Sequence, residues 1–139
     1  MSIPDLSFSQ IQIGDSAQFV RSISEKDVEA FALLSGDTNP LHMDTAYAQT
    51  TPFGKRIVHG MLIASLTSTL LGMHLPGKRC LYLGEKLSFK KPVYIGDTVT
   101  VRGEVTHKSE ATKTITISIA ISRNDDIVVT GEALAQALV

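Results

Sequence analysis

The order of hydrophobic and polar residues changes character about halfway along the chain. Up to residue 75, apolar residues recur mostly at helical spacing, whereas from Arg79 onward they alternate with polar ones. One earlier strand is predicted over 15–23. The pattern therefore predicts a helical first half and a sheet in the second half.

Two helices stand out in the first half. Ser24 is a good N-cap, Asp27 three residues later resembles a capping box, and Gly36 provides a C-terminal stop. A single helical turn is predicted over 45–49. The second long helix, 59–75, is apolar on nearly all sides, which predicts a buried helix about 25 Å long.

The second half predicts consecutive strands joined by short turns. Alternation predicts strands over 98–107, 112–122 and 127–138, and the last two are separated by an Asn-Asp-Asp hairpin turn. The segment 81–93 fits either one long strand or two. An antiparallel meander after a buried helix indicates the α+β class, and one economical packing wraps the sheet around the helix.

Composition and charge narrow the range of functions. The 139 residues fit one domain spanning 1–139, and 43% hydrophobic residues argue against disorder. A net charge of −1 without a long basic run argues against a nucleic-acid partner. Cys80 stands alone, which excludes an intrachain disulfide and a metal site built on cysteine pairs.

The same properties predict a cytoplasmic protein. A lone cysteine fits a reducing compartment. No signal-peptide pattern is visible over 1–15. The apolar region 57–75 is interrupted by His59, Ser65, Thr67, Ser68 and His74, which argues against a membrane span.

The segment 35–42, Ser-Gly-Asp-Thr-Asn-Pro-Leu-His, carries the candidate chemistry. Asp37 and His42 flank an Asn-Pro pair, which favours a turn over a helix running through it. A carboxylate and an imidazole on either side of a turn can converge on one water molecule. Taken singly, such residues are more often turn-formers or solvated groups, and His59 is interpreted as fixing the start of the second long helix.

Several segments together resemble the MaoC-like (R)-specific enoyl-CoA hydratases. They are 35–42, the Ile-Val-His-Gly-Met-Leu of 57–62, the Tyr-Leu-Gly of 82–84, and 87–93 followed by Gly96 and Asp97. The resemblance implies the hot dog fold, an acyl-CoA thioester substrate, a homodimer and no cofactor or metal. It also implies that water adds reversibly to a trans-2-enoyl thioester, a reaction whose (R)-3-hydroxyacyl products often feed polyhydroxyalkanoate synthesis in this family.

The resemblance also implies the site residues. Asp37 and His42 would hold the water and share the two proton transfers, and which of them is the base stays open. The backbone N–H of Gly60 would stabilise the thioester oxyanion at the helix N-terminus. Ser68 would steady Asp37, and Asn39 would brace the turn and bind the water or the loop.

Residues for the rest of the substrate are assigned by apolarity and charge. The candidates for an acyl slot are Leu66, Leu70, Leu71, Leu134 and Ala135, and those for the CoA phosphates are Arg56, Lys86, Lys90 and Lys91. The alternatives are a 3-hydroxyacyl-acyl-carrier-protein dehydratase, an acyl thioesterase, and a non-catalytic acyl-CoA-binding regulator. Thioesterases of this fold place their carboxylates differently, and an intact Asp37/His42 pair argues against a decayed enzyme.

Overall fold

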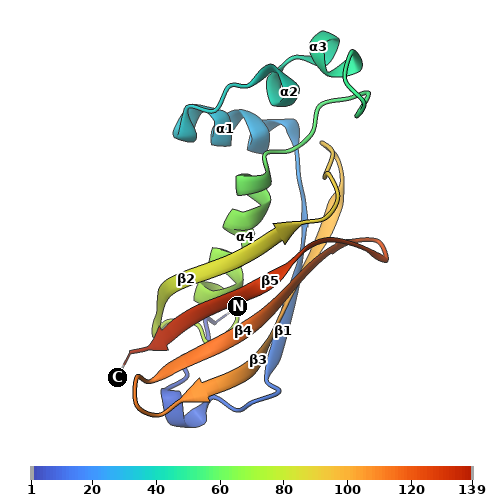
Figure 1. Ribbon diagram of the computed structural model, residues 1–139. Helices are drawn as coiled ribbons and strands as arrows, with labels where there is room; N and C mark the ends of the chain where they lie inside the picture. The colour runs from blue at the N-terminus through green and yellow to red at the C-terminus, as the bar shows by residue number, and fades with distance from the viewer. Residues whose placement is uncertain (1, 139) are drawn as a thin grey trace.

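The structure is a computed structural model that describes residues 2–138. Its sheet has five antiparallel strands in the order β1-β3-β4-β5-β2, with the helix α4 packed against it (Figure 1). The strands are β1 Ser16–Ser22, β2 Cys80–Phe89, β3 Thr98–Ser109, β4 Thr114–Arg123 and β5 Asp126–Ala137. The helices are α1 Glu25–Ser35, α2 Pro40–Met43, α3 Thr45–Gln49 and α4 Gly60–Met73, after a 3-10 turn at Phe8–Gln10. The predicted α+β class and hot dog fold are confirmed.

Strict alternation of side chains gives the sheet one apolar face. In β4, Ile115, Ile117, Ile119 and Ile121 are all buried, while the residues between them are half-buried or exposed. Register shifts interrupt the pairing of β2 with β5, of β3 with β4 and of β4 with β5. Such bulges increase the local bend of a strand, and here they accompany a sheet that curves around α4.

A missing side chain lets α4 lie close to the sheet. A Cβ atom on Gly103 of β3 would lie 2.7 Å from the Leu70 side chain and 2.9 Å from that of Ile117. Leu70 is completely buried, as is Leu71 beside it. Gly103 therefore sets the spacing between helix and sheet, and the buried side chains form one core cluster.

One face of α4 remains open, which the sequence did not predict. Met61 is 63% exposed, and Ser65 and Ser68 are also exposed. These positions recur at i, i+4 and i+7 and therefore lie along one stripe of the helix. The prediction of a helix buried on all sides is wrong for this stripe.

The boundaries of α1 agree with the predicted caps. Ser24 accepts a hydrogen bond from the Asp27 N–H, and the Asp27 carboxylate accepts one from the Ser24 N–H. The helix ends at Gly36, which has a left-handed φ of 81°. The four-residue α2 was not predicted, and the segment 81–93 forms one strand that ends at Phe89.

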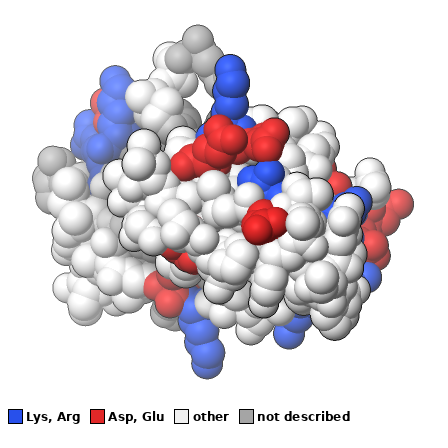
Figure 2. All heavy atoms as spheres, turned by 90° about the horizontal axis from the view of Figure 1, so that it is seen from above, with Lys and Arg blue, Asp and Glu red and all other residues white. Residues whose placement is uncertain are grey.

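The helices α1, α2 and α3 gather beyond the N-terminal end of α4 (Figure 1). On the face of the molecule seen from this end, cationic side chains lie singly or in small groups among acidic and uncharged ones (Figure 2). This face does not present the continuous basic surface that nucleic-acid binding favours. Within residues 2–138, every helix is too short or too polar to cross a bilayer.

Candidate active site

The turn between α1 and α2 is built by local hydrogen bonds. The Asp37 N–H donates to the Ser35 hydroxyl over 3.2 Å, and the Asn39 N–H donates to the Asp37 carboxylate over 3.2 Å. Asn39 caps α2, because its side-chain oxygen accepts from the Leu41 N–H at 2.9 Å. The chain therefore reverses within a few residues and places Asp37 and His42 on the same side of the turn.

Asp37 and His42 face each other across a short gap. The distance from His42 Nε2 to Asp37 Oδ2 is 4.0 Å, which is too long for a direct hydrogen bond. It suits one water that makes a hydrogen bond of about 2.8 Å to each group. The His42 side chain is 14% exposed and that of Asp37 is 51% exposed, so bulk water reaches the carboxylate side.

The backbone fixes the tautomer of His42. Its Nδ1 lies 2.8 Å from the carbonyl oxygen of Ile57, and a carbonyl oxygen can only accept. Nδ1 therefore carries the hydrogen, and Nε2 presents its lone pair toward Asp37. This is the form of a neutral imidazole that can take a proton from a water molecule.

His59 is a third titratable residue at this site. Its Nε2 lies 2.9 Å from the Asp37 carbonyl oxygen, and its ring stacks on that of His42 with centroids 4.0 Å apart. Possible ligand atoms of Asp37, His42 and His59 lie within 4.8 Å of one another. The two imidazole planes are only 30° apart, however, so their in-plane lone pairs do not converge on one ion.

Gly60 opens α4 and offers a free donor. Among residues 2–138 no acceptor bonds its N–H, as is normal for the first residue of a helix. A Cβ at this position would lie 3.3 Å from the Phe89 ring, so glycine keeps the approach open. The helix N-terminus adds partial positive charge, which favours an oxyanion.

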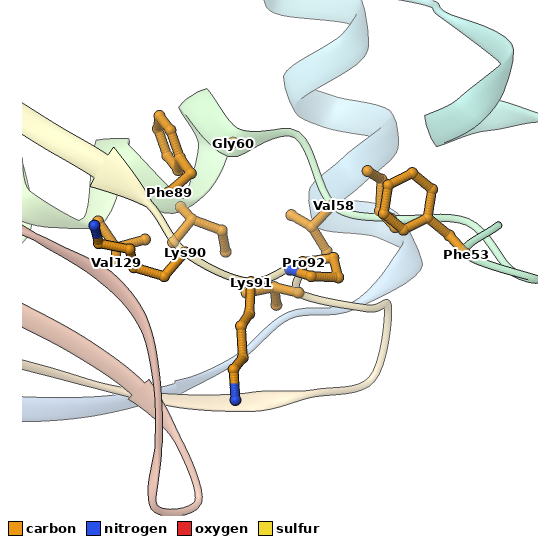
Figure 3. A pocket seen from close by; sticks show the side chains of 11 residues that line it. Phe53, Val58, Gly60, Phe89, Lys90, Lys91, Pro92 and Val129 are labelled. Atoms are coloured by element: carbon orange, nitrogen blue, oxygen red, sulfur yellow. The ribbon is translucent and has the colours of Figure 1, made fainter.

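A pocket of about 280 Å³ begins at Gly60. Figure 3 shows Phe89 beside Gly60, and Phe53 on the far side of Val58. The walls are mainly apolar and include Ile63 and Val129, neither of which was singled out from the sequence. Their contributions depend on pairing between distant segments, so no local motif marks them.

Two lysines, Lys90 and Lys91, line the same pocket, and their assignment to the CoA phosphates stays a prediction. Lys91 forms an ion pair with Asp126 at 3.0 Å. Arg56 is engaged elsewhere, because it donates to the His42 carbonyl at 2.6 Å and pairs with Glu25 at 2.7 Å. Arg56 therefore links α1 to the main chain at His42.

The residues predicted for the acyl slot lie apart from this pocket. Four of them are core residues with exposures of 6% or less, and the fifth is 41% exposed: Leu66, Leu70, Leu71 and Ala135, then Leu134. None lines the pocket at Gly60. Their substrate-binding role stays a prediction, and Ile63, Phe89 and Val129 are additional candidates.

Ser68 does not meet Asp37 within one chain. It lies eight residues beyond Gly60, which corresponds to about 12 Å along the helix axis. It lines a second cleft of about 510 Å³ between α4 and β2, together with Met61 and Leu83. Its predicted role in steadying Asp37 stays a prediction.

A polar cluster lies in this second cleft. The Tyr82 hydroxyl donates to Glu85 and lies 2.9 Å from the Thr67 hydroxyl, which is itself 2.9 Å from Glu85. Burial and the neighbouring carboxylate raise the pKa of Tyr82 well above its ordinary value. The phenol therefore stays protonated, and it links β2 to the middle of α4.

Comparisons with known proteins agree on one family. A sequence model described as MaoC like domain matches residues 9–125. An (R)-specific enoyl-CoA hydratase of Aeromonas caviae is 46% identical over 94% of this chain and 98% of its own length. One of Rhodospirillum rubrum is 45% identical, over 91% and 88%. The solved structure of an A. caviae (R)-hydratase involved in PHA biosynthesis is 47% identical with a TM-score of 0.88, covering 91% of this chain and 97% of that one.

Proposed function

Because this chain belongs to the MaoC-like domain family, we propose that it catalyses the (R)-specific hydration of trans-2-enoyl-CoA to (R)-3-hydroxyacyl-CoA. The observation that carries the proposal is the Asp37–His42 pair held 4.0 Å apart next to the start of α4. The resemblance inferred from the sequence motifs is confirmed by relatives that match nearly the whole chain.

The pair activates one water. His42 Nε2 accepts a proton from the water, while the Asp37 carboxylate accepts a hydrogen bond from its other hydrogen. The water oxygen forms a bond to Cβ, and the C=C π electrons move toward the thioester to give an enolate. The proton held by the pair then passes to Cα. Both additions occur on the face of the alkene that the pair occupies, so the addition is syn.

The Gly60 N–H stabilises the enolate oxygen. The donor points beyond the helix terminus and is preorganised, so the developing charge meets a donor that needs no reorientation. A single donor of this kind is worth about 10²–10³ in kcat. The apolar pocket beside Gly60 would hold the substrate around the thioester, with Lys90 and Lys91 near the CoA phosphates.

We propose that the working unit is a homodimer. The open stripe of α4 and the edge strand β2 expose Met61, Leu81 and Leu83, which are 63%, 44% and 48% exposed. A second copy packed there would cover these side chains and would bring a Ser68 hydroxyl near the half-exposed Asp37 carboxylate. Such an interface would also shield the catalytic water from bulk solvent.

The wider setting of the reaction is also a proposal. A single domain acting in the cytoplasm is what the sequence predicted, and residues 1 and 139 lie outside the described residues. The A. caviae (R)-hydratase is involved in PHA biosynthesis. We propose the same outlet for the (R)-3-hydroxyacyl-CoA formed here.

Purified protein mixed with crotonyl-CoA tests the function directly. We expect loss of the enoyl thioester absorbance and formation of the 3R alcohol, determined by chiral analysis. Asp37→Asn and His42→Ala should each lower kcat at least about 10²-fold, because each removes a proton-handling group.

Other outcomes identify the alternatives. Release of free CoA would indicate a thioesterase, and tight binding of acyl-CoA without turnover would indicate a regulator. Turnover of the acyl-carrier-protein thioester at a much higher kcat/KM than the CoA thioester would favour the dehydratase. Formation of the 3S alcohol would contradict the proposed stereochemistry.

A further inference from the structure

His59 contacts both members of the catalytic pair. Its Nε2 lies 2.9 Å from the Asp37 carbonyl oxygen, and its ring stacks on the His42 ring at 4.0 Å. The residue is only 1% exposed. It therefore lies behind the pair as a buried support.

The hydrogen bond from His59 to Asp37 connects the catalytic turn, the segment 35–42 that joins α1 to α2, to a distant part of the sequence. Within residues 2–138, every other hydrogen bond made by residues 36–38 stays inside 32–39. The bond from His59 spans 22 positions in the sequence. Among the hydrogen bonds of residues 36–38, this side-chain donor alone links the turn to a distant part of the fold that the structure describes.

Helix capping does not explain the histidine. His59 occupies the N-cap of α4, yet its side chain caps no N–H of that helix. The carbonyl oxygen of Asp37 accepts, so Nε2 carries the hydrogen and Nδ1 holds a lone pair. That Nδ1 is buried and lacks a hydrogen-bond partner among the described residues.

Stability does not explain it either. A buried polar atom without a partner is unfavourable for folding. A phenylalanine has a flat aromatic ring that is one atom larger than imidazole, and it would pack on Phe31, whose ring centroid lies 4.9 Å from that of His59, without burying an unpaired Nδ1. What phenylalanine cannot supply is the Nε2–H donor to Asp37.

We propose that His59 is a positioning residue for the hydration reaction. Its Nε2–H fixes the main chain of Asp37, while its ring face fixes the plane of the His42 imidazole. Together these contacts set the gap between Asp37 Oδ2 and His42 Nε2 in which the reacting water is held. The proposal rests on the proposed hydratase function.

Three substitutions of His59 distinguish the contribution of its Nε2–H donor from that of its ring. His59→Phe keeps the ring and removes the donor. His59→Gln removes the ring, but its amide nitrogen reaches the position of Nε2, whereas the amide of His59→Asn is one bond shorter. His74→Phe is the control, because His74 lies at the opposite end of α4 and stacks on Phe19.

The readouts are kcat and KM for crotonyl-CoA hydration together with the thermal unfolding midpoint. We expect His59→Phe to lower kcat at least about tenfold with KM nearly unchanged, because small misplacements of reacting groups are costly. Its unfolding midpoint should stay close to that of the wild type, because the variant loses the hydrogen bond to Asp37 but no longer buries an unpaired Nδ1. The kcat of His59→Gln should be several-fold higher than that of His59→Asn. The control variant His74→Phe should have the wild-type kcat.

A His59→Phe variant with wild-type kcat would overturn the proposal. The proposal would also be overturned if the loss of kcat in the three His59 variants were proportional to the decrease in their unfolding midpoints. Imidazole 15N NMR separates this failure from failure of the hydratase function, since it needs no turnover. We expect hydrogen on Nε2 of His59 in the wild type and shifted, broadened His42 signals in His59→Phe. Unchanged His42 signals would refute the positioning role even if the protein is not a hydratase.

Discussion

At the scale of single residues, the two sides of the reaction come from different kinds of group. The proposed proton-handling groups are side chains, those of Asp37 and His42. The proposed oxyanion donor is the main-chain N–H of Gly60, where the lack of a side chain keeps the approach open beside Phe89. Main-chain donors cannot be removed by ordinary substitutions, but the first position of a helix tolerates proline.

Gly60→Pro therefore tests the oxyanion donor. Proline removes the N–H, and the extended backbone of His59, with φ −53° and ψ 130°, suits a residue before proline. We expect kcat to fall by about 10²–10³ with the fold retained in circular dichroism spectra. Gly60→Ala is the matched control, since it adds the same Cβ beside Phe89 and keeps the N–H. Equal losses in both variants would assign the effect to crowding.

The catalytic turn was predictable because it is local. Ser35, Asp37 and Asn39 hydrogen-bond with near neighbours, so spacing and residue type were enough to predict a turn. The contact of His59 with the Asp37 carbonyl and the place of Phe89 beside Gly60 join distant segments. Local pattern carries no information about such contacts, and His59 was accordingly interpreted as a residue of the helix start.

At the scale of elements, α1 carries the catalytic turn at its C-terminal end and is held at its N-terminal end by a capping box. Backbone hydrogen bonding from Ser24 is the main cause that lowers the pKa of Asp27, and Arg21, paired at 2.8 Å, lowers it further. A carboxyl group whose pKa is lowered by folding stabilises the fold when the pH is above its unfolded-state pKa. This contribution is lost as the pH falls through the folded-state pKa.

Asp27→Asn should therefore lower the free energy of unfolding by about 1 kcal/mol at pH 7. The difference between variant and wild type should shrink as pH falls below about 4, because wild-type Asp27 then becomes protonated. Urea unfolding at several pH values measures both quantities. Asp125→Asn, in the exposed turn before β5, should change stability by less than about 0.5 kcal/mol. A difference that stays constant down to pH 2 would contradict this account.

The elements themselves were mostly predictable from the sequence. Alternating Val and Ile residues marked β3 and β4, and Ser24 and Gly36 marked α1. The short turns predicted that β3, β4 and β5 are neighbours, whereas the positions of β1 and β2 at the two edges of the sheet were not predicted. The open stripe of α4 was missed, since Met61 is as apolar as its buried neighbours and composition does not reveal which face is covered.

At the scale of the whole molecule, the two edge strands of the sheet differ in their surroundings. The β1 edge exposes Val20, at 61%, whereas the β2 edge lies beside the open stripe of α4 and the cleft that contains Ser68. An edge strand next to exposed apolar side chains is a natural site for pairing with another chain. This asymmetry supports assembly through β2.

Sedimentation should detect a dimer of the wild-type chain. Leu83→Glu should give a monomer, because a carboxylate would be buried without a partner in the interface. Its kcat should fall at least about tenfold, because the second copy of the chain no longer shields Asp37 from bulk water. Val20→Glu is the matched control on the opposite edge and should remain dimeric and active. A wild-type monomer with full activity would exclude the proposed assembly.

Both imidazoles of the site are oriented by carbonyl oxygens of the main chain, those of Ile57 and Asp37. A peptide carbonyl is present whatever amino acid occupies the position. A change of the side chain at position 57 therefore alters the wall of the pocket at Gly60 without changing which nitrogen of His42 carries the hydrogen. Substitution of the Ile57 side chain would therefore leave this function undetected, because the group that orients His42 belongs to the peptide bond and not to the side chain.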